Sequence, residues 1–143
     1  MLRILFVSRR FPPDFRSGSE TVISELYQRA RAEHEVNLVA GFQRDRSLVP
    51  SECVGVDLRD AHQGSKQFRM YRAAGQQIRR FRPDVILSNN LEVPTRGGRT
   101  VCIIHDLNFD HPKHGIGDWL RERMYGMGSH RFAAVITPSN ATR

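Results

Sequence analysis

A histidine and an aspartate stand side by side where an apolar run ends. His105 and Asp106 follow Val101–Ile104, a run typical of a buried strand. A histidine there can donate a hydrogen bond to a sugar hydroxyl or a phosphate oxygen, and the aspartate can orient it. In an equally open alternative, the histidine only satisfies nearby backbone groups. The pair is the first candidate for chemistry in this chain.

The segment Ser17-Gly18-Ser19 is the second candidate, because it precedes a stretch of helical periodicity. Backbone N–H groups and the positive end of the helix dipole can hold a phosphate there, and glycine allows close approach. Neither a G-x-G-x-x-G sequence nor a Walker lysine is present, so a dinucleotide site or a P-loop is not indicated. An ordinary turn and helix cap is the other interpretation.

Metal and nucleophile chemistry find little support. His105, His111 and His114 have aspartates nearby, but their spacing matches no compact ligand pattern, so we expect no metal site. The sequence lacks the G-x-S-x-G elbow of serine hydrolases. Cys53 and Cys102 lie in apolar runs, and we expect reduced core residues of a cytosolic protein rather than a disulfide.

Apolar runs and amphipathic stretches alternate along the chain. The runs predict strands at residues 2–7, 36–40, 53–58, 85–87, 100–104 and 134–137. Helices are expected at residues 65–81 and 117–132, and after a capping box of Ser17 and Glu20. The first helix has one apolar stripe, formed by Val22, Ile23, Leu26, Tyr27 and Ala30. This order predicts an α/β fold, a Rossmann-like parallel sheet with helices on both faces, in a single domain spanning residues 1–143.

Ligands of open parallel sheets gather at the carboxyl ends of the strands. The segments expected at that edge are residues 9–19, the stretch from Gly41, Asn89-Asn90 and His105-Asp106. The connection at residues 89–99 is near the minimum length for a parallel crossover.

The charge of the chain is strongly basic. Among 143 residues, 22 Lys and Arg stand against 15 Asp and Glu, which gives a formal net charge of +7. This balance favours a nucleic acid, a phosphate-bearing ligand or an anionic membrane surface. Only Lys66 and Lys113 are lysines, so the arginine content can equally reflect genome composition. No apolar run approaches the ~20 residues that span a bilayer, and the start does not resemble a signal peptide.

The helix expected around Lys66 to Arg82 concentrates this charge. At ~100° per residue, an arc of roughly 140° holds Lys66, Arg69, Arg72, Arg79 and Arg80. The opposite side holds Met70, Tyr71, Ala74, Ile78 and Phe81. The simpler interpretation is a helix that covers the sheet and leaves Phe68 partly exposed. The other is contact with anionic lipid or a phosphorylated acceptor. Only Phe68 and Tyr71 could stack on bases, so no nucleic-acid partner is expected.

Six short motifs then follow one another along nearly the whole chain. They are Ile4–Ser8, Phe11-Pro12-Pro13 with Ser17–Glu20, His34-Glu35-Val36, Arg82–Ile86, Val101–Phe109 and Ala134–Ser139. In this order they resemble the N-terminal domain of a GT-B glycosyltransferase of the retaining glycosyltransferase family 4 type. The position before Gly18 departs from that family's glycine pair, because it is a serine.

The resemblance implies an enzyme that transfers a sugar from a nucleotide sugar, of the UDP or GDP type, to a glycan or lipid-linked acceptor without a metal. It implies that Ser17–Ser19 contact the donor phosphate. His105 would contact the transferred sugar, Asp106 would support it, and Asn89 and Asn90 would line the acceptor side.

The resemblance also implies a C-terminal donor-binding domain, absent from this chain, so the chain alone is expected to be inactive and to bind no cofactor. Polysaccharide biosynthesis is the implied process, and the cytoplasm, peripheral at the inner face of the membrane, is the implied location. A non-catalytic flavodoxin-like or nucleotide-binding module is the alternative. An open sheet edge also invites pairing with a second copy.

Overall fold

The computed structural model describes residues 1–14, 18–89, 93–94, 99–104 and 131–137. Within them, one sheet of six strands has the order β3-β2-β1-β4-β5-β6, and all its neighbouring strands are parallel. The strands are β1 (Arg3–Ser8), β2 (Glu35–Phe42), β3 (Val54–Asp57), β4 (Val85–Ser88), β5 (Arg99–Ile103) and β6 (Ala134–Ile136). Each strand predicted from an apolar run is therefore confirmed, and no predicted end is more than two residues from the observed one.

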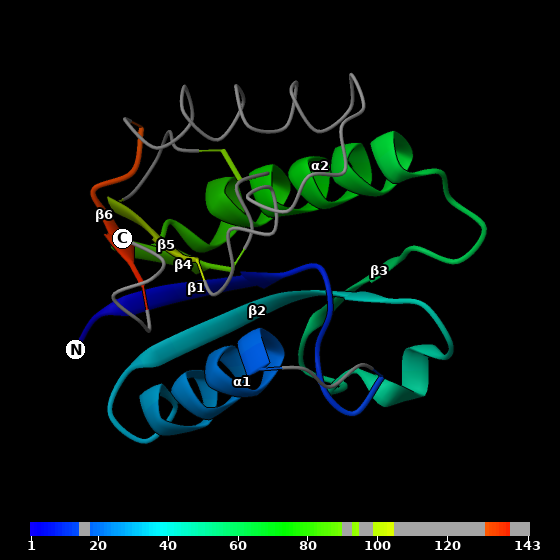
Figure 1. The fold of residues 1–143 in the computed structure, drawn as a ribbon. Coiled ribbons are helices and arrows are strands. Elements are labelled where there is room, and N and C mark those ends of the chain that lie inside the picture. The colour runs from blue at the N-terminus through cyan, green and yellow to red at the C-terminus, as the bar shows by residue number, and fades with distance from the viewer. Residues whose placement is uncertain (15–17, 90–92, 95–98, 105–130, 138–143) are drawn as a thin grey trace.

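Two helices cover opposite faces of this sheet (Figure 1). They are α1 (Gly18–Ala30) and α2 (Gln63–Phe81), and a short 3-10 helix, η1 (Arg46–Leu48), follows β2. The predicted α/β fold with helices on both faces is confirmed. The helix predicted at residues 117–132 lies outside the described residues, apart from its last two positions. Because β4 and β5 are neighbours in the sheet, the short connection at residues 89–99 suffices for a parallel pair.

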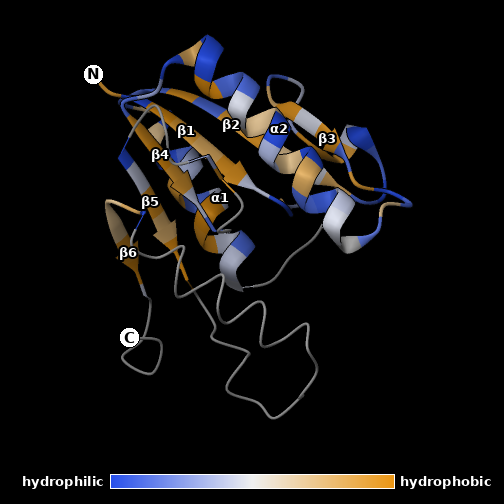
Figure 2. Ribbon diagram, turned by 90° about the horizontal axis from the view of Figure 1, so that it is seen from above, coloured by the Kyte–Doolittle hydropathy of each residue, from blue (hydrophilic) through white to orange (hydrophobic). Residues whose placement is uncertain are grey.

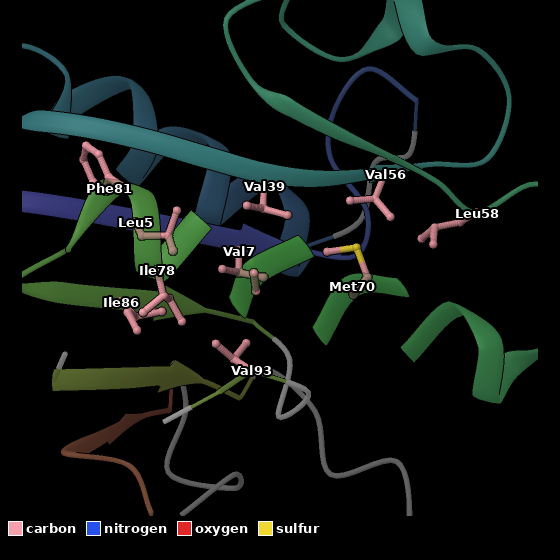
Figure 3. Close-up of a cluster of buried hydrophobic side chains, with 11 residues drawn as sticks. Leu5, Val7, Val39, Val56, Leu58, Met70, Ile78, Phe81, Ile86 and Val93 are labelled. Carbon is pink, nitrogen blue, oxygen red and sulfur yellow. The ribbon is translucent and has the colours of Figure 1, made fainter. Parts of the chain in front are cut away.

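The sheet has a hydrophobic core on each face, because successive side chains of a strand point to opposite sides. Leu5 and Val7 of β1 face α2, while Phe6 between them faces α1. Figure 3 shows the α2 side, where strand residues meet Met70 and Ile78 of the helix. Burial on both faces explains why the strands are continuous apolar runs, and Figure 2 shows β1 and β4 as largely hydrophobic.

The apolar stripe predicted for α1 is too wide. Ile23 and Tyr27 are buried, but Val22 is 36% exposed and Leu26 is 37% exposed. The reason is that α1 packs against β1 and β2, which cover only the residues directly above them. The Tyr27 ring is contacted edge-on by Phe6 and Phe11, with ring centroids 5.5 and 5.9 Å away.

Helix α2 begins two residues before the predicted start and ends at Phe81 as expected. Arg82 adopts the left-handed conformation, with φ 49°, and its N–H donates to the Ile78 carbonyl at 2.9 Å. Pro83 then prevents the helix from continuing. Among the described residues, no helix combines the length and the apolar character needed to cross a membrane.

Both cysteines are buried and neither forms a disulfide, as predicted. Burial raises the pKa of the Cys102 thiol to about 12. Cys53 Sγ lies 3.5 Å from the Tyr27 hydroxyl, and burial raises the pKa values of both groups. Neither thiol is suited to be a nucleophile at neutral pH.

Candidate functional site

The strand order places a topological switch between β1 and β4. The chain adds β2 and β3 on one side of β1, and then returns to add β4 on the other side. In open parallel sheets, the carboxyl edge at such a switch point is the usual ligand site. Ser88 Oγ donates to the Val7 carbonyl at 3.1 Å, and both Ser8 and Ser88 are fully buried. The carboxyl ends of β1 and β4 are therefore packed together at the base of the candidate site.

The loop that follows β1, here called the first loop (residues 9–14), is held against the sheet. A Cβ atom at Gly41 of β2 would lie 2.4 Å from the Arg9 carbonyl oxygen and 2.4 Å from Leu58 Cδ1. Only glycine therefore fits at this position of β2 without movement of the backbone. Phe11 is 2% exposed, because its ring packs on Tyr27 of α1.

A buried carboxylate connects the first loop to the next loop along the sheet edge. Asp14 is 2% exposed, and it accepts hydrogen bonds from the N–H groups of Gln43, at 2.8 Å, and Arg44, at 3.1 Å. Gln43 and Arg44 begin the second loop (residues 43–45), between β2 and η1. Charge-assisted bonds of this kind are about twice as strong as neutral ones. The carboxylate thus holds two loops of the candidate site in register.

Helix α1 is the next described element after the first loop. Gly18 opens the helix, is exposed, and has open space around the position of a Cβ atom. Ser19 Oγ donates to Glu20 Oε2 at 2.9 Å, and the Glu20 side chain is buried. Ser17, the remaining residue of the predicted phosphate segment and of the capping box, lies outside the described residues. The accessible part of this helix end is therefore its backbone around Gly18.

The remaining predicted site residues follow β4 and β5. Asn89 directly follows β4 and is half-buried, whereas Asn90 lies outside the described residues. Beyond β5, the Ile104 N–H donates to the Ile136 carbonyl at 2.9 Å, so the backbone is held as far as Ile104. His105 and Asp106 are the next residues in the chain, and both lie outside the described residues. In the described part of the chain, no three His, Cys, Asp or Glu residues are grouped as metal ligands would be.

One flank of α2, next to Pro94, forms a separate feature. An open groove of about 440 Å³ runs along it, here called the α2 groove, lined by Phe68, Tyr71, Arg72, Gly75, Ile78, Arg79 and Pro94. Phe68 is 65% exposed, as expected for a residue at the edge of the basic arc. Tyr71 is 51% exposed, so its predicted place on the buried side is wrong. Figure 2 shows the resulting alternation of hydrophilic and hydrophobic residues along this helix.

The prediction of the basic arc needs one further correction. Arg69 Nη1 donates to the Asp57 carbonyl of β3 at 2.9 Å, so this guanidinium is directed to the end of β3. Arg72 and Arg79 are the arc residues that line the groove.

The sequence model of the family described as Glycosyltransferase Family 4 matches residues 16–143, which include nearly every element described above. The chain belongs to glycosyltransferase family 4. Among curated proteins, no match to this family 4 chain is found.

Two solved structures share the fold of this family 4 chain. UDP-GlcNAc 2-epimerase from Methanocaldococcus jannaschii is 11% identical, with a TM-score of 0.61, and the match covers 99% of this chain and 40% of the epimerase. An alpha-glucosyltransferase in complex with UDP and a 13-mer DNA containing a central A:G mismatch is 18% identical, with a TM-score of 0.53. That match covers 100% of this chain and 38% of the glucosyltransferase. The chain thus spans about two fifths of each structure, and the predicted Rossmann-like lobe of GT-B type is confirmed.

Two residues of this edge were not found from the sequence of the family 4 chain. Asp14 carries no signal of its partners, since the N–H groups that it binds are about 30 residues away and belong to the backbone. Gly41 stands in the sequence only as the start of a segment after a predicted strand, although a glycine in a strand can mark a close backbone approach.

Proposed function

We propose that this chain forms the acceptor-side half of a nucleotide-sugar-dependent glycosyltransferase. The donor-binding half would be a C-terminal domain. The observation that carries the proposal is the family match over residues 16–143, on a sheet whose switch point lies between β1 and β4. The two solved structures support a second half, because this chain covers only 40% and 38% of them.

In the proposed reaction, an acceptor hydroxyl attacks the anomeric carbon of a UDP- or GDP-sugar. The hydroxyl attacks on the face from which the phosphate departs, the bond from that carbon to the donor phosphate oxygen breaks, and the nucleoside diphosphate leaves with the hydroxyl proton. We propose retention at the anomeric carbon and no need for a metal ion. The backbone N–H groups of Ser17–Ser19 would stabilise the negative charge that develops on the phosphate. The open space at Gly18 supports this role.

The other roles follow from the strand ends. We propose that His105 contacts the transferred sugar at the carboxyl end of β5, that Asp106 orients it, and that Asn89 and Asn90 line the acceptor side. The parallel pairing of β4 with β5 supports this assignment, because it brings the ends of these two strands to one edge.

For the acceptor, we propose a lipid-linked glycan at the inner face of the membrane. The support is the α2 groove, where exposed Phe68 and Tyr71 lie beside Arg72 and Arg79. Aromatic side chains at an interface combine with cations that attract anionic headgroups. The sheet-covering role of α2 is retained, since Met70, Ala74 and Ile78 remain buried.

The test uses an enzyme that contains this domain and its donor-binding domain. We expect His105→Ala to lower kcat by about 100-fold or more, because one well-placed donor in an active site contributes about that factor. His62→Ala is the matched control, since His62 is exposed and its side chain makes no capping hydrogen bond. An unchanged kcat in His105→Ala, with His62→Ala also unchanged, would remove His105 from the mechanism.

A further inference from the structure

Asp14 is unusual because, among the residues that the structure describes, the hydrogen bonds to its buried carboxylate come from backbone N–H groups. Each of its oxygens accepts one N–H group, Oδ2 from Gln43 at 2.8 Å and Oδ1 from Arg44 at 3.1 Å. Because only 2% of Asp14 is exposed, water replaces these bonds poorly. Their geometry is independent of the side chains at residues 43 and 44.

The carboxylate is one of several contacts that hold the first loop. The Arg9 carbonyl rests on Gly41, the Phe11 ring rests on Tyr27, and Asp14 binds the second loop. Asp14 is the last described residue before Gly18, where α1 begins. The second loop is fixed in turn by Asp45, whose side chain accepts the Ser47 N–H at 2.9 Å and caps η1.

We infer that Asp14 is a positioning residue for the donor-phosphate end of the site, an inference that rests on the proposed function. Its carboxylate fixes the end of the first loop four positions before Gly18, and we infer that this fixed point keeps the N–H groups of Gly18 and Ser19 in place before the donor arrives. A preformed site saves the cost of ordering the loop on binding. Asp14 itself acts only through the backbone that it holds.

Asp14→Asn is the most selective change, because it keeps the shape of the side chain and one acceptor oxygen. The new NH₂ group must face one of the two N–H donors, so one bond is lost and two donors oppose each other. Asp84→Asn is the matched control. Asp84 Oδ2 accepts the Arg3 N–H at 2.8 Å, so this carboxylate also connects distant segments, but at the amino end of β1 and β4.

Amide hydrogen exchange of the 143-residue chain is the first measurement. In the unmodified protein we expect protection of the Gln43 and Arg44 amides, and in Asp14→Asn exchange at both that is about ten-fold faster or more. We also expect shifted amide resonances at Gly18 and Ser19 in Asp14→Asn, and unchanged ones in Asp84→Asn. Unprotected amides at Gln43 and Arg44 in the unmodified protein would overturn the inference, even where Asp14→Asn fails to fold.

Steady-state kinetics of the two-domain enzyme is the second measurement. We expect Asp14→Asn to raise the KM for the nucleotide sugar about ten-fold while kcat changes less than about two-fold. If Asp14 had a purely structural role, Asp14→Asn and Asp84→Asn would both lower the amount of folded enzyme, and the KM would stay unchanged. This result would overturn the inference. If neither the unmodified enzyme nor its variants transfer sugar, the proposed function is refuted instead. The hydrogen-exchange measurement would still test the role of Asp14 independently.

Discussion

Adding one methyl group at Gly41 tests how tightly the first loop is packed on the sheet. In Gly41→Ala the new Cβ would lie 2.4 Å from the Arg9 carbonyl oxygen, about 1 Å closer than ordinary contact. The Leu58 methyl group, also 2.4 Å away, can rotate, but the Arg9 carbonyl belongs to the backbone. The first loop must therefore move outward.

Overpacking of this kind costs about 1–3 kcal/mol. For a domain of this size, each kcal/mol lowers Tm by about 3–4 °C, so we expect Gly41→Ala to melt about 3–12 °C below the unmodified protein. Thermal unfolding followed by circular dichroism measures the difference, and urea unfolding supplies an independent value.

Gly75→Ala is the control for the chemical change itself. Gly75 lies inside α2, and a Cβ there would be 3.6 Å from Pro94 Cγ, which is ordinary contact. Alanine in a helix interior is more stable than glycine by up to about 1 kcal/mol, so we expect this variant to melt higher. A Gly41→Ala protein that melts at or above the unmodified protein would show that the first loop is not seated on β2, and the reasoning would fail.

Further predictions concern three other parts of the chain. A Cβ at Gly55 would lie 2.4 Å from Arg46 Nε, so Gly55→Ala should displace the guanidinium from the Val49 and Cys53 carbonyls that it binds at 2.9 and 2.8 Å. Urea unfolding should show a loss of about 1–2 kcal/mol that nearly vanishes in an Arg46→Ala background, whereas additive losses would contradict the contact. Burial raises the pKa of Cys102 to about 12, so in the native protein at pH 8 it should resist iodoacetamide, as mass spectrometry can show. Unfolding restores the ordinary thiol pKa, so the stability that Cys102 contributes should be lost as pH rises from about 9 toward 12. The urea midpoint measures this loss. If the Cys102 thiol is its cause, the midpoint of Cys102→Ala should not show the same fall with pH. Arg72→Gln should lower the affinity for anionic vesicles about five-fold in a sedimentation assay, since one cation near such a surface contributes about 1 kcal/mol. Arg29→Gln, in α1 on the other face of the sheet, should leave this affinity unchanged. Equal effects of the two changes would indicate net charge rather than the α2 groove.

The strands could be predicted because each is buried on both faces. A run such as Ile4–Val7 has few other uses in a folded domain, and the order of runs and helices then determines a Rossmann-like topology. Helical periodicity identified the buried side of α2 through Met70 and Ile78. It cannot say how far the sheet reaches across a helix, and for that reason Val22, Leu26 and Tyr71 were wrongly assigned to buried sides.

The candidate site was predictable only where it follows a strand end. Gly18, Ser19 and Asn89 lie at the expected edge, because strand ends follow from the apolar runs. The Asp14 carboxylate was beyond reach, since its partners are backbone N–H groups whose position depends on the finished sheet. The same holds for Gly41, whose need for glycine arises from the Arg9 carbonyl on another strand end.

The most direct test of the central claim is the rate at which nucleoside diphosphate is released from UDP- and GDP-sugars in the presence of acceptor. It is measured for the 143-residue chain alone and for a polypeptide in which the donor-binding domain follows it. The account predicts release, coupled to sugar transfer, only from the two-domain polypeptide, because the proposed function assigns the donor site to the second domain. Sustained sugar transfer by the 143-residue chain alone would contradict it.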